Sequence, residues 1–154
     1  MNVGDKAPDF TLYSEEKQPV NLHETLKNGP VLLLFFPAAF TGTCTTELHE
    51  VTNNLGAYSP AQVFGVSTDT IFSLAEYSKS NGFKVSLLSD HNAEVAEAFD
   101  CKFDHNFGPM KYDRIARRGS FLIDTDGIVQ YAEVLDNPGN LPDLAGIIDT
   151  IASL

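Results

Sequence analysis

The chain has 154 residues and a mass of 16.8 kDa, so we expect a single domain over residues 1–154. Hydrophobic residues make up 43% of the chain, which is enough for a packed core. The 21 acidic residues against 10 basic ones give a formal charge of −11, which argues against nucleic acids and anionic membranes as partners.

Hydrophobic patterning and turn signals predict an alternation of strands and helices. In chain order, strands are predicted at residues 10–12, 19–21, 31–36, 62–67, 85–88, 120–124 and 128–134. Helices are predicted at residues 22–27, 43–55, 70–81, 92–99 and from about 140 to the end of the chain. Val31–Phe36 is apolar without alternation, which is typical of a central strand covered on both faces. The order predicts an α/β fold in which a central mixed sheet is flanked by helices.

Several local signals sharpen these boundaries. Asp69 and Asn92 are expected to cap the helices that follow them. Thr125-Asp126-Gly127 predicts a hairpin between the last two strands. The apolar stripe of the last helix is predicted to face the core through Leu141, Leu144, Ala145, Ile148, Ile151 and Ala152.

Cys44 would lie in the first turn of the helix that begins at Thr43, after the most buried strand. In open α/β sheets, such a junction is a common place for a ligand site. Free backbone N–H groups and the positive end of the helix dipole favour a thiolate there over a thiol. Because Cys44 shares the inward helix face with Leu48, we expect its sulfur to be partly shielded from water. The alternative is an inert, buried thiol.

Two residues of the preceding loop could support a reactive Cys44. Thr41 carries a hydroxyl that can donate one hydrogen bond and accept another. Pro37 has no N–H and stiffens the loop that would cover the sulfur. The N–H of Cys44 itself can donate at the turn from loop to helix.

A thiolate also needs a cation, and the three arginines of the chain all lie between residues 114 and 118. Arg117 and Arg118 directly precede the strand at 120–124, which makes them the natural source of that cation. Glu47, one helical turn after Cys44, could hold the arginine by a bidentate contact. The alternatives are a surface ion pair for the arginine and an ordinary exposed acid for Glu47.

The pattern Pro37-x-x-x-Thr41-x-x-Cys44 resembles the active-site signature of the peroxiredoxins, which are thiol peroxidases with a thioredoxin-like fold. The resemblance extends to the opening Gly4–Phe10, to Leu88–Asp90 and to Arg118–Asp124, and it runs nearly from end to end. It assigns the catalytic arginine to Arg118 rather than Arg117. Within the family, the segment Phe36–Gly42 and the short C-terminus look most like the one-cysteine alkyl hydroperoxide reductase E subgroup.

The resemblance implies a two-step reaction with hydrogen peroxide or an organic hydroperoxide. The Cys44 thiolate attacks the peroxide and becomes a sulfenic acid. A second thiol then attacks the sulfenic acid, and a reductant such as thioredoxin, glutaredoxin or a low-molecular-weight thiol reduces the resulting disulfide by thiol exchange. The resemblance implies no metal and no organic cofactor, and family members usually form dimers or rings, so we expect a homodimer.

Cys101 has two interpretations. It either resolves the oxidised Cys44 after local unfolding, or it is a core residue in a one-cysteine enzyme, and we favour the second. Peroxiredoxins carry resolving cysteines at several places, and the position of Cys101, 57 residues after Cys44, corresponds to none of them.

Two other functions are alternatives to peroxide reduction. A thioredoxin-like thiol–disulfide oxidoreductase would need a second cysteine three residues after Cys44, where Glu47 stands instead. A non-enzymatic redox sensor or chaperone would be oxidised once without turnover. Two cysteines give no disulfide scaffold, no secretory signal is visible, and no apolar run is long enough to span a membrane, so a cytoplasmic location is expected.

Overall fold

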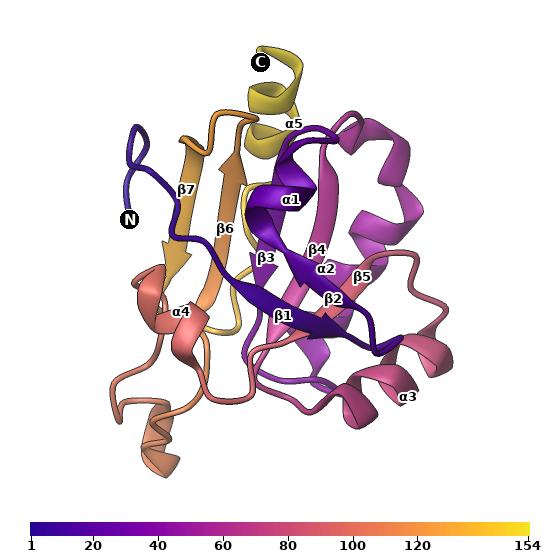
Figure 1. The fold of residues 1–154 in the computed structure, drawn as a ribbon. Helices are drawn as coiled ribbons and strands as arrows, with labels where there is room; N and C mark the ends of the chain where they lie inside the picture. Colours follow the sequence, from indigo (N-terminus) through magenta and orange to yellow (C-terminus); the bar gives the residue numbers. More distant parts are fainter.

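The computed structural model describes residues 1–154 and contains one seven-stranded sheet (Figure 1). The strands are β1 (Thr11–Ser14), β2 (Pro19–Asn21), β3 (Val31–Phe35), β4 (Gln62–Ser67), β5 (Ser86–Ser89), β6 (Arg118–Ile123) and β7 (Val129–Leu135). Their order across the sheet is β2-β1-β5-β4-β3-β6-β7. β3, β4 and β5 run parallel, whereas β1, β2, β6 and β7 pair with their neighbours in an antiparallel manner. The predicted mixed sheet is therefore confirmed.

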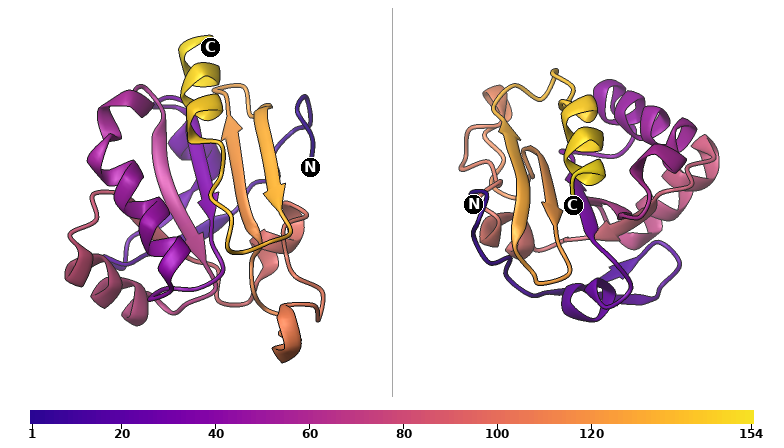
Figure 2. Two further views of the ribbon diagram at one scale, coloured as in Figure 1. Left: turned by 180° about the vertical axis from the view of Figure 1, so that it is seen from behind. Right: turned by 90° about the horizontal axis from the view of Figure 1, so that it is seen from above.

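Helices cover both faces of this sheet (Figure 2). They are α1 (Leu22–Leu26), α2 (Gly42–Asn53), α3 (Ile71–Asn81), α4 (Glu94–Ala98) and α5 (Leu144–Ala152), with 3-10 turns η1 (Leu55–Tyr58) and η2 (Gly108–Met110). One face packs α1 and α4 around Val31, Leu33 and Phe35. The opposite face packs η1, α2 and α5 around Leu32 and Leu34. All five β3 residues are buried, because alternate side chains enter the two cores.

The ends of four elements meet where the central strands end. β3 ends at Phe35 and α2 begins at Gly42, while Phe35 pairs with Gly119 near the start of β6. Arg118 in turn pairs with Leu135 at the end of β7. In Figure 1 these strand ends lie at the bottom of the sheet, so segments that are far apart in the sequence come together there.

Both predicted helix caps are wrong, for a different reason in each case. At α3, Thr70 is the N-cap and accepts from Ser73 N–H, because the Asp69 carboxylate is engaged elsewhere. At α4, the residue in the cap position is Ala93. Asp90, which lies outside the helix, instead accepts hydrogen bonds from the N–H groups of Val95 and Ala96, which have no partner within the helix.

The last helix starts later than predicted. Asp143 is its N-cap and accepts from Gly146 N–H, so the helix begins at Leu144 rather than near residue 140. Leu141 therefore lies before the helix and is exposed, and the predicted inward residues Ala145 and Ala152 are exposed as well. The buried positions are Ile147 and Ile151.

None of the helices is both long and apolar enough to cross a membrane.

Candidate active site

Cys44 lies in the first turn of α2 and is 2% exposed. Its neighbours in the core come from three elements and include Phe36, Leu48, Leu74 and Tyr77. The predicted shielding of the sulfur is confirmed. Thr41 holds the N-cap position but makes no side-chain cap, so N–H groups of the first helical turn have no helical partner and point toward the start of the helix.

The guanidinium of Arg118 is the cation nearest to this sulfur. Arg118 Nη2 lies 3.2 Å from Cys44 Sγ and also donates to the carbonyl oxygen of Pro138 at 2.9 Å. Nη1 donates to Glu47 Oε1 at 3.1 Å. Although Arg118 is buried, which opposes its charge, the charges of Glu47 and Cys44 raise its pKa above the usual value. A buried cation thus faces the sulfur at hydrogen-bonding distance.

Glu47 is fully buried rather than exposed, one helical turn beyond Cys44. Its contact with Arg118 uses one carboxylate oxygen, while Oε2 has no partner, so the expected bidentate contact is absent. Complete burial outweighs the attraction of Arg118 and raises the pKa of Glu47 to about 7. Glu47 therefore holds the arginine, and the carboxyl group of Glu47 changes its own charge close to neutral pH.

The loop that covers the sulfur is held at several points. Pro37 is buried, and the N–H of Ala39 donates to Asp69 Oδ2 at 2.8 Å. Phe40 adopts a left-handed backbone with φ of 64°, which is strained for a residue with a side chain. Thr41 is exposed, and its hydroxyl donates to the carbonyl of Ala38 at 2.7 Å. The hydroxyl oxygen of Thr41 therefore keeps lone pairs free to accept.

Three further residues belong to this site and were missed in the sequence. Asp69 binds the covering loop, and Pro138 contributes only a backbone carbonyl, which no side-chain pattern can reveal. Tyr77 of α3 hydrogen-bonds Thr45 Oγ1 at 2.8 Å, and Thr45 itself donates to the carbonyl of Thr41. Leu74 and Tyr77 are three residues apart, so they share the buried face of α3. This spacing is the sequence signal that could have placed Tyr77 toward the site.

Cys101 lies on the other side of β6 from Cys44. Its side chain packs against Gly119, where an added Cβ would lie 3.3 Å from Cys101 Cβ. Gly119 and Arg118 are consecutive strand residues and so face opposite sides of the sheet, and Arg118 points to Cys44. Burial raises the pKa of the Cys101 thiol well above its usual range. The backbone of β6 thus separates a solvent-shielded, neutral thiol from the site.

Arg117 is directed away from Cys44. Its Nη1 donates to Asp136 Oδ1 at 2.9 Å, and its guanidinium lies over the ring of Phe103 at 4.5 Å. His49 is also not a partner of Cys44, since its Nε2 is 3.1 Å from Asn81 Oδ1. Of the two candidate arginines, only Arg118 reaches the sulfur.

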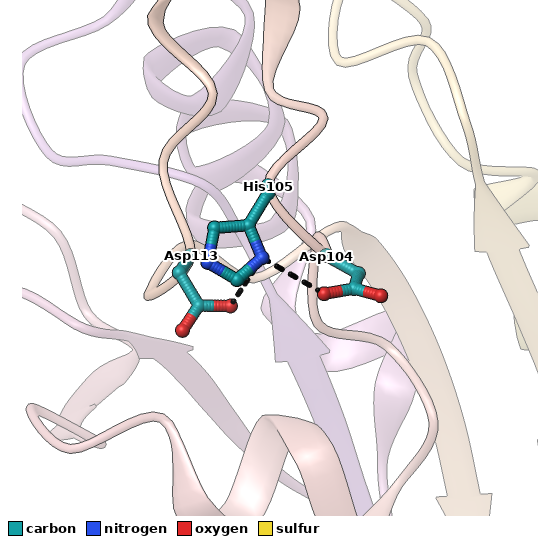
Figure 3. A group of neighbouring side chains, drawn as sticks. All are labelled: Asp104, His105 and Asp113. Carbon is teal, nitrogen blue, oxygen red and sulfur yellow. Dashed lines mark hydrogen bonds and ion pairs between the residues drawn. The ribbon is translucent and has the colours of Figure 1, made fainter.

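A second polar cluster lies on the loop between α4 and β6, where His105 sits between Asp104 and Asp113 (Figure 3). Each of the three offers one potential ligand atom for a metal, and these atoms lie within 4.8 Å of one another. However, Lys102 Nζ lies 3.1 Å from the same Asp113 oxygen that faces His105, and its ammonium already neutralises that carboxylate. We interpret the cluster as a surface ion-pair network that joins the two ends of the loop.

Comparison with known proteins agrees with this geometry. Residues 3–132 match the model of the AhpC/TSA family. The chain is 35% identical to alkyl hydroperoxide reductase E of Mycobacterium tuberculosis, with 100% of this chain and 98% of the relative covered. It is 33% identical to peroxiredoxin Bcp of Escherichia coli, with 85% and 84% covered. The crystal structure of peroxidoxin BcpB from Mycobacterium tuberculosis superimposes with a TM-score of 0.87 at 29% identity, covering 100% of this chain and 98% of that one.

Proposed function

The chain belongs to the AhpC/TSA family and is a peroxiredoxin, a thiol-dependent peroxidase, and we propose that Cys44 is its peroxidatic cysteine. The observation that carries this assignment is the contact of 3.2 Å between Arg118 Nη2 and the buried Sγ of Cys44. A guanidinium at this distance stabilises a thiolate and cannot itself be deprotonated. The other thiol, Cys101, is buried against Gly119 without such a cation.

In the first step the Cys44 thiolate attacks the terminal oxygen of a hydroperoxide. An S–O bond forms, the O–O bond breaks, and the electron pair leaves with the distal oxygen as hydroxide or alkoxide, which takes up a proton. Arg118 and the free N–H groups at the start of α2 stabilise the negative charge that moves along this line. The sulfur ends as a sulfenic acid.

Thr41 and Pro37 arrange the peroxide and its surroundings in this proposal. Because the Thr41 hydroxyl donates to Ala38, its oxygen can accept the O–H of the incoming hydroperoxide and so orient the O–O bond. Pro37 is buried and rigid, and it keeps the covering loop close to the sulfur. Glu47 holds Arg118 through Nη1, while Nη2 of the same guanidinium faces the sulfur.

In the second step a reductant thiol attacks the sulfenic sulfur, and a disulfide forms as water leaves. We propose that this thiol comes from thioredoxin, glutaredoxin or a low-molecular-weight thiol and not from Cys101. The position of Cys101 across β6 supports a one-cysteine mechanism, because a disulfide with Cys44 would require one of the two to cross the sheet.

Steady-state consumption of hydrogen peroxide with these three reductants, measured side by side, tests the proposal. We expect turnover with at least one of them and none in Cys44→Ser. Turnover in Cys44→Ser would reject Cys44 as the peroxidatic residue. A single round of oxidation with every reductant would instead favour a redox sensor, and disulfide exchange without peroxide consumption would favour a thioredoxin-like oxidoreductase.

We further propose that the protein is a cytoplasmic homodimer. Exposed aromatic side chains on and near α3 support a self-association surface: Phe72 is 69% exposed, Phe40 packs on Tyr77 while remaining exposed, and Tyr13 lines a shallow cleft together with Ile71. Sedimentation analysis should give a dimer for the wild type and a monomer for Phe72→Glu. A monomeric wild type would contradict this part of the proposal.

A further inference from the structure

The orientation of Arg118 depends on a segment outside the active-site motif. Apart from Cys44, the guanidinium contacts Glu47 through Nη1 and the Pro138 carbonyl through Nη2, while Nε has no partner. Pro138 lies in the connection from β7 to α5, which crosses the lower ends of β6 and β3 in the rear view (Figure 2, left). Since Nη2 also faces Cys44 Sγ, the carbonyl of Pro138 helps to determine where the second N–H of that nitrogen points.

The neighbouring arginine holds the same connection from outside. Arg117 Nη1 donates to Asp136 Oδ1 at 2.9 Å, only two residues before Pro138. The Arg117 side chain is 18% exposed and rests on Phe103, whereas the Asp136 side chain is 96% exposed. The better-fixed partner is therefore the arginine, and the loop is attached to it.

The segment between these contacts is a compact turn, so the position of Asp136 is coupled to that of Pro138. Asn137 Oδ1 accepts from Gly139 N–H at 2.9 Å, and the carbonyl of Asn137 accepts from Asn140 N–H at 3.1 Å. These bonds restrict the backbone on both sides of Pro138. Consecutive arginines thus bind one turn at two points, Arg117 at a side chain and Arg118 at a carbonyl.

We propose that Arg117 and Asp136 are positioning residues for peroxide reduction, whose ion pair holds the turn of residues 136–140 so that the Pro138 carbonyl orients Arg118 toward Cys44. This inference rests on the proposed function, because it assigns a role in the reaction of Cys44. Neither residue touches the sulfur, so both act through Arg118.

The test is the second-order rate constant for oxidation of Cys44 by hydrogen peroxide in Asp136→Asn and Arg117→Gln, with mass spectrometry as the readout. Because exposed ion pairs contribute little free energy, we expect each variant to be about 2- to 5-fold slower than the wild type at low salt. The double variant should be no slower than either single one, since both remove the same interaction. Arg117→Lys, which keeps the charge, should recover part of the rate lost in Arg117→Gln.

Glu24→Gln is the matched control, because it removes the exposed Glu24–Lys27 pair of 3.0 Å on α1, away from the site. It should leave the rate unchanged. High salt should slow the wild type toward the Asp136→Asn rate while affecting that variant less. Thermal unfolding of every variant shows whether a slower rate comes from a less stable fold.

Unchanged rates in both single variants would overturn the inference, and so would additive losses in the double variant. Equal slowing by Glu24→Gln, or slowing that merely follows lost stability, would also overturn it. In each of these cases the wild type would still oxidise rapidly at Cys44. Failure of the proposed function is a different result, in which Cys44 of the wild type does not react with peroxide.

Discussion

Arg118 Nη2 lies 3.2 Å from Cys44 Sγ, although the two residues are 74 positions apart in the chain. Antiparallel pairing of β6 with the central strand β3 brings the start of β6 beside the start of α2. The contact thus depends on sheet topology rather than on any local motif. It supplies a fixed positive charge inside a chain whose formal charge is −11.

Arg118→Lys should slow oxidation of Cys44 by peroxide. A lysine keeps the charge but has a single nitrogen, which cannot serve Cys44, Glu47 and the Pro138 carbonyl in their present places. Loss of one preorganised donor at a charge-developing centre typically costs about 100-fold in rate, and we expect a loss of this order. Competition kinetics against a reference peroxidase measures it. Arg114→Lys, at an exposed arginine, is the matched control, and equal rates in the two variants would refute the role of Arg118.

Glu47→Gln should reveal a pH dependence of stability. The pKa of Glu47 rises from its usual 4.5 to about 7 on folding, so the folded chain binds this proton more tightly than the unfolded one. The stability that the group contributes is complete below pH 4.5 and is lost as the pH rises through about 7. The free energy of unfolding of the wild type should therefore fall relative to Glu47→Gln across this window.

Urea unfolding at several pH values from 4 to 8 measures that difference, and Glu50→Gln on the exposed side of the same helix should show no such trend. A wild type that gains stability relative to Glu47→Gln as the pH rises would mean that the Arg118 ion pair outweighs burial.

Cys101→Ala should retain peroxide turnover within about 2-fold, because the thiol is buried on the far side of β6 and its removal costs mainly packing. After one equivalent of peroxide without reductant, intact-protein mass spectrometry should find no intrachain disulfide in the wild type. A disulfide between Cys44 and Cys101 would reject the one-cysteine mechanism.

Much of the fold could be predicted because strong patterns had a single physical solution. The uninterrupted apolar run Val31–Phe36 predicts a strand buried on both faces, and the turn residues around Gly127 predict a hairpin. β3 is such a strand, and β6 and β7 form that hairpin. The helix starts could not be predicted as well. Asp69 and Asn92 are residue types that often cap helices. In the structure, however, Asp69 accepts from the N–H of Ala39, and Asp90 rather than Asn92 accepts from an N–H of α4.

The site shows the same division. Cys44, Thr41 and Pro37 lie in one continuous segment, so their proximity follows from the chain itself. The proximity of Arg118 to Cys44 was expected only from the resemblance to a family. The Pro138 carbonyl has no side-chain signature, and the full burial of Glu47 depends on the tertiary packing that brings Arg118 of β6 to α2. Neither could be derived from residue spacing.

The most direct test of the account is the rate at which Cys44 forms a sulfenic acid. The reduced protein is mixed with one equivalent of hydrogen peroxide, trapped with dimedone and digested for mass spectrometry, in the folded state and after unfolding in urea. We predict rapid labelling of Cys44 and an unmodified Cys101 in the folded protein, and slow labelling of both in the unfolded protein, where Arg118 no longer faces the sulfur. Folded Cys44 that reacts no faster than unfolded Cys44 would contradict the account.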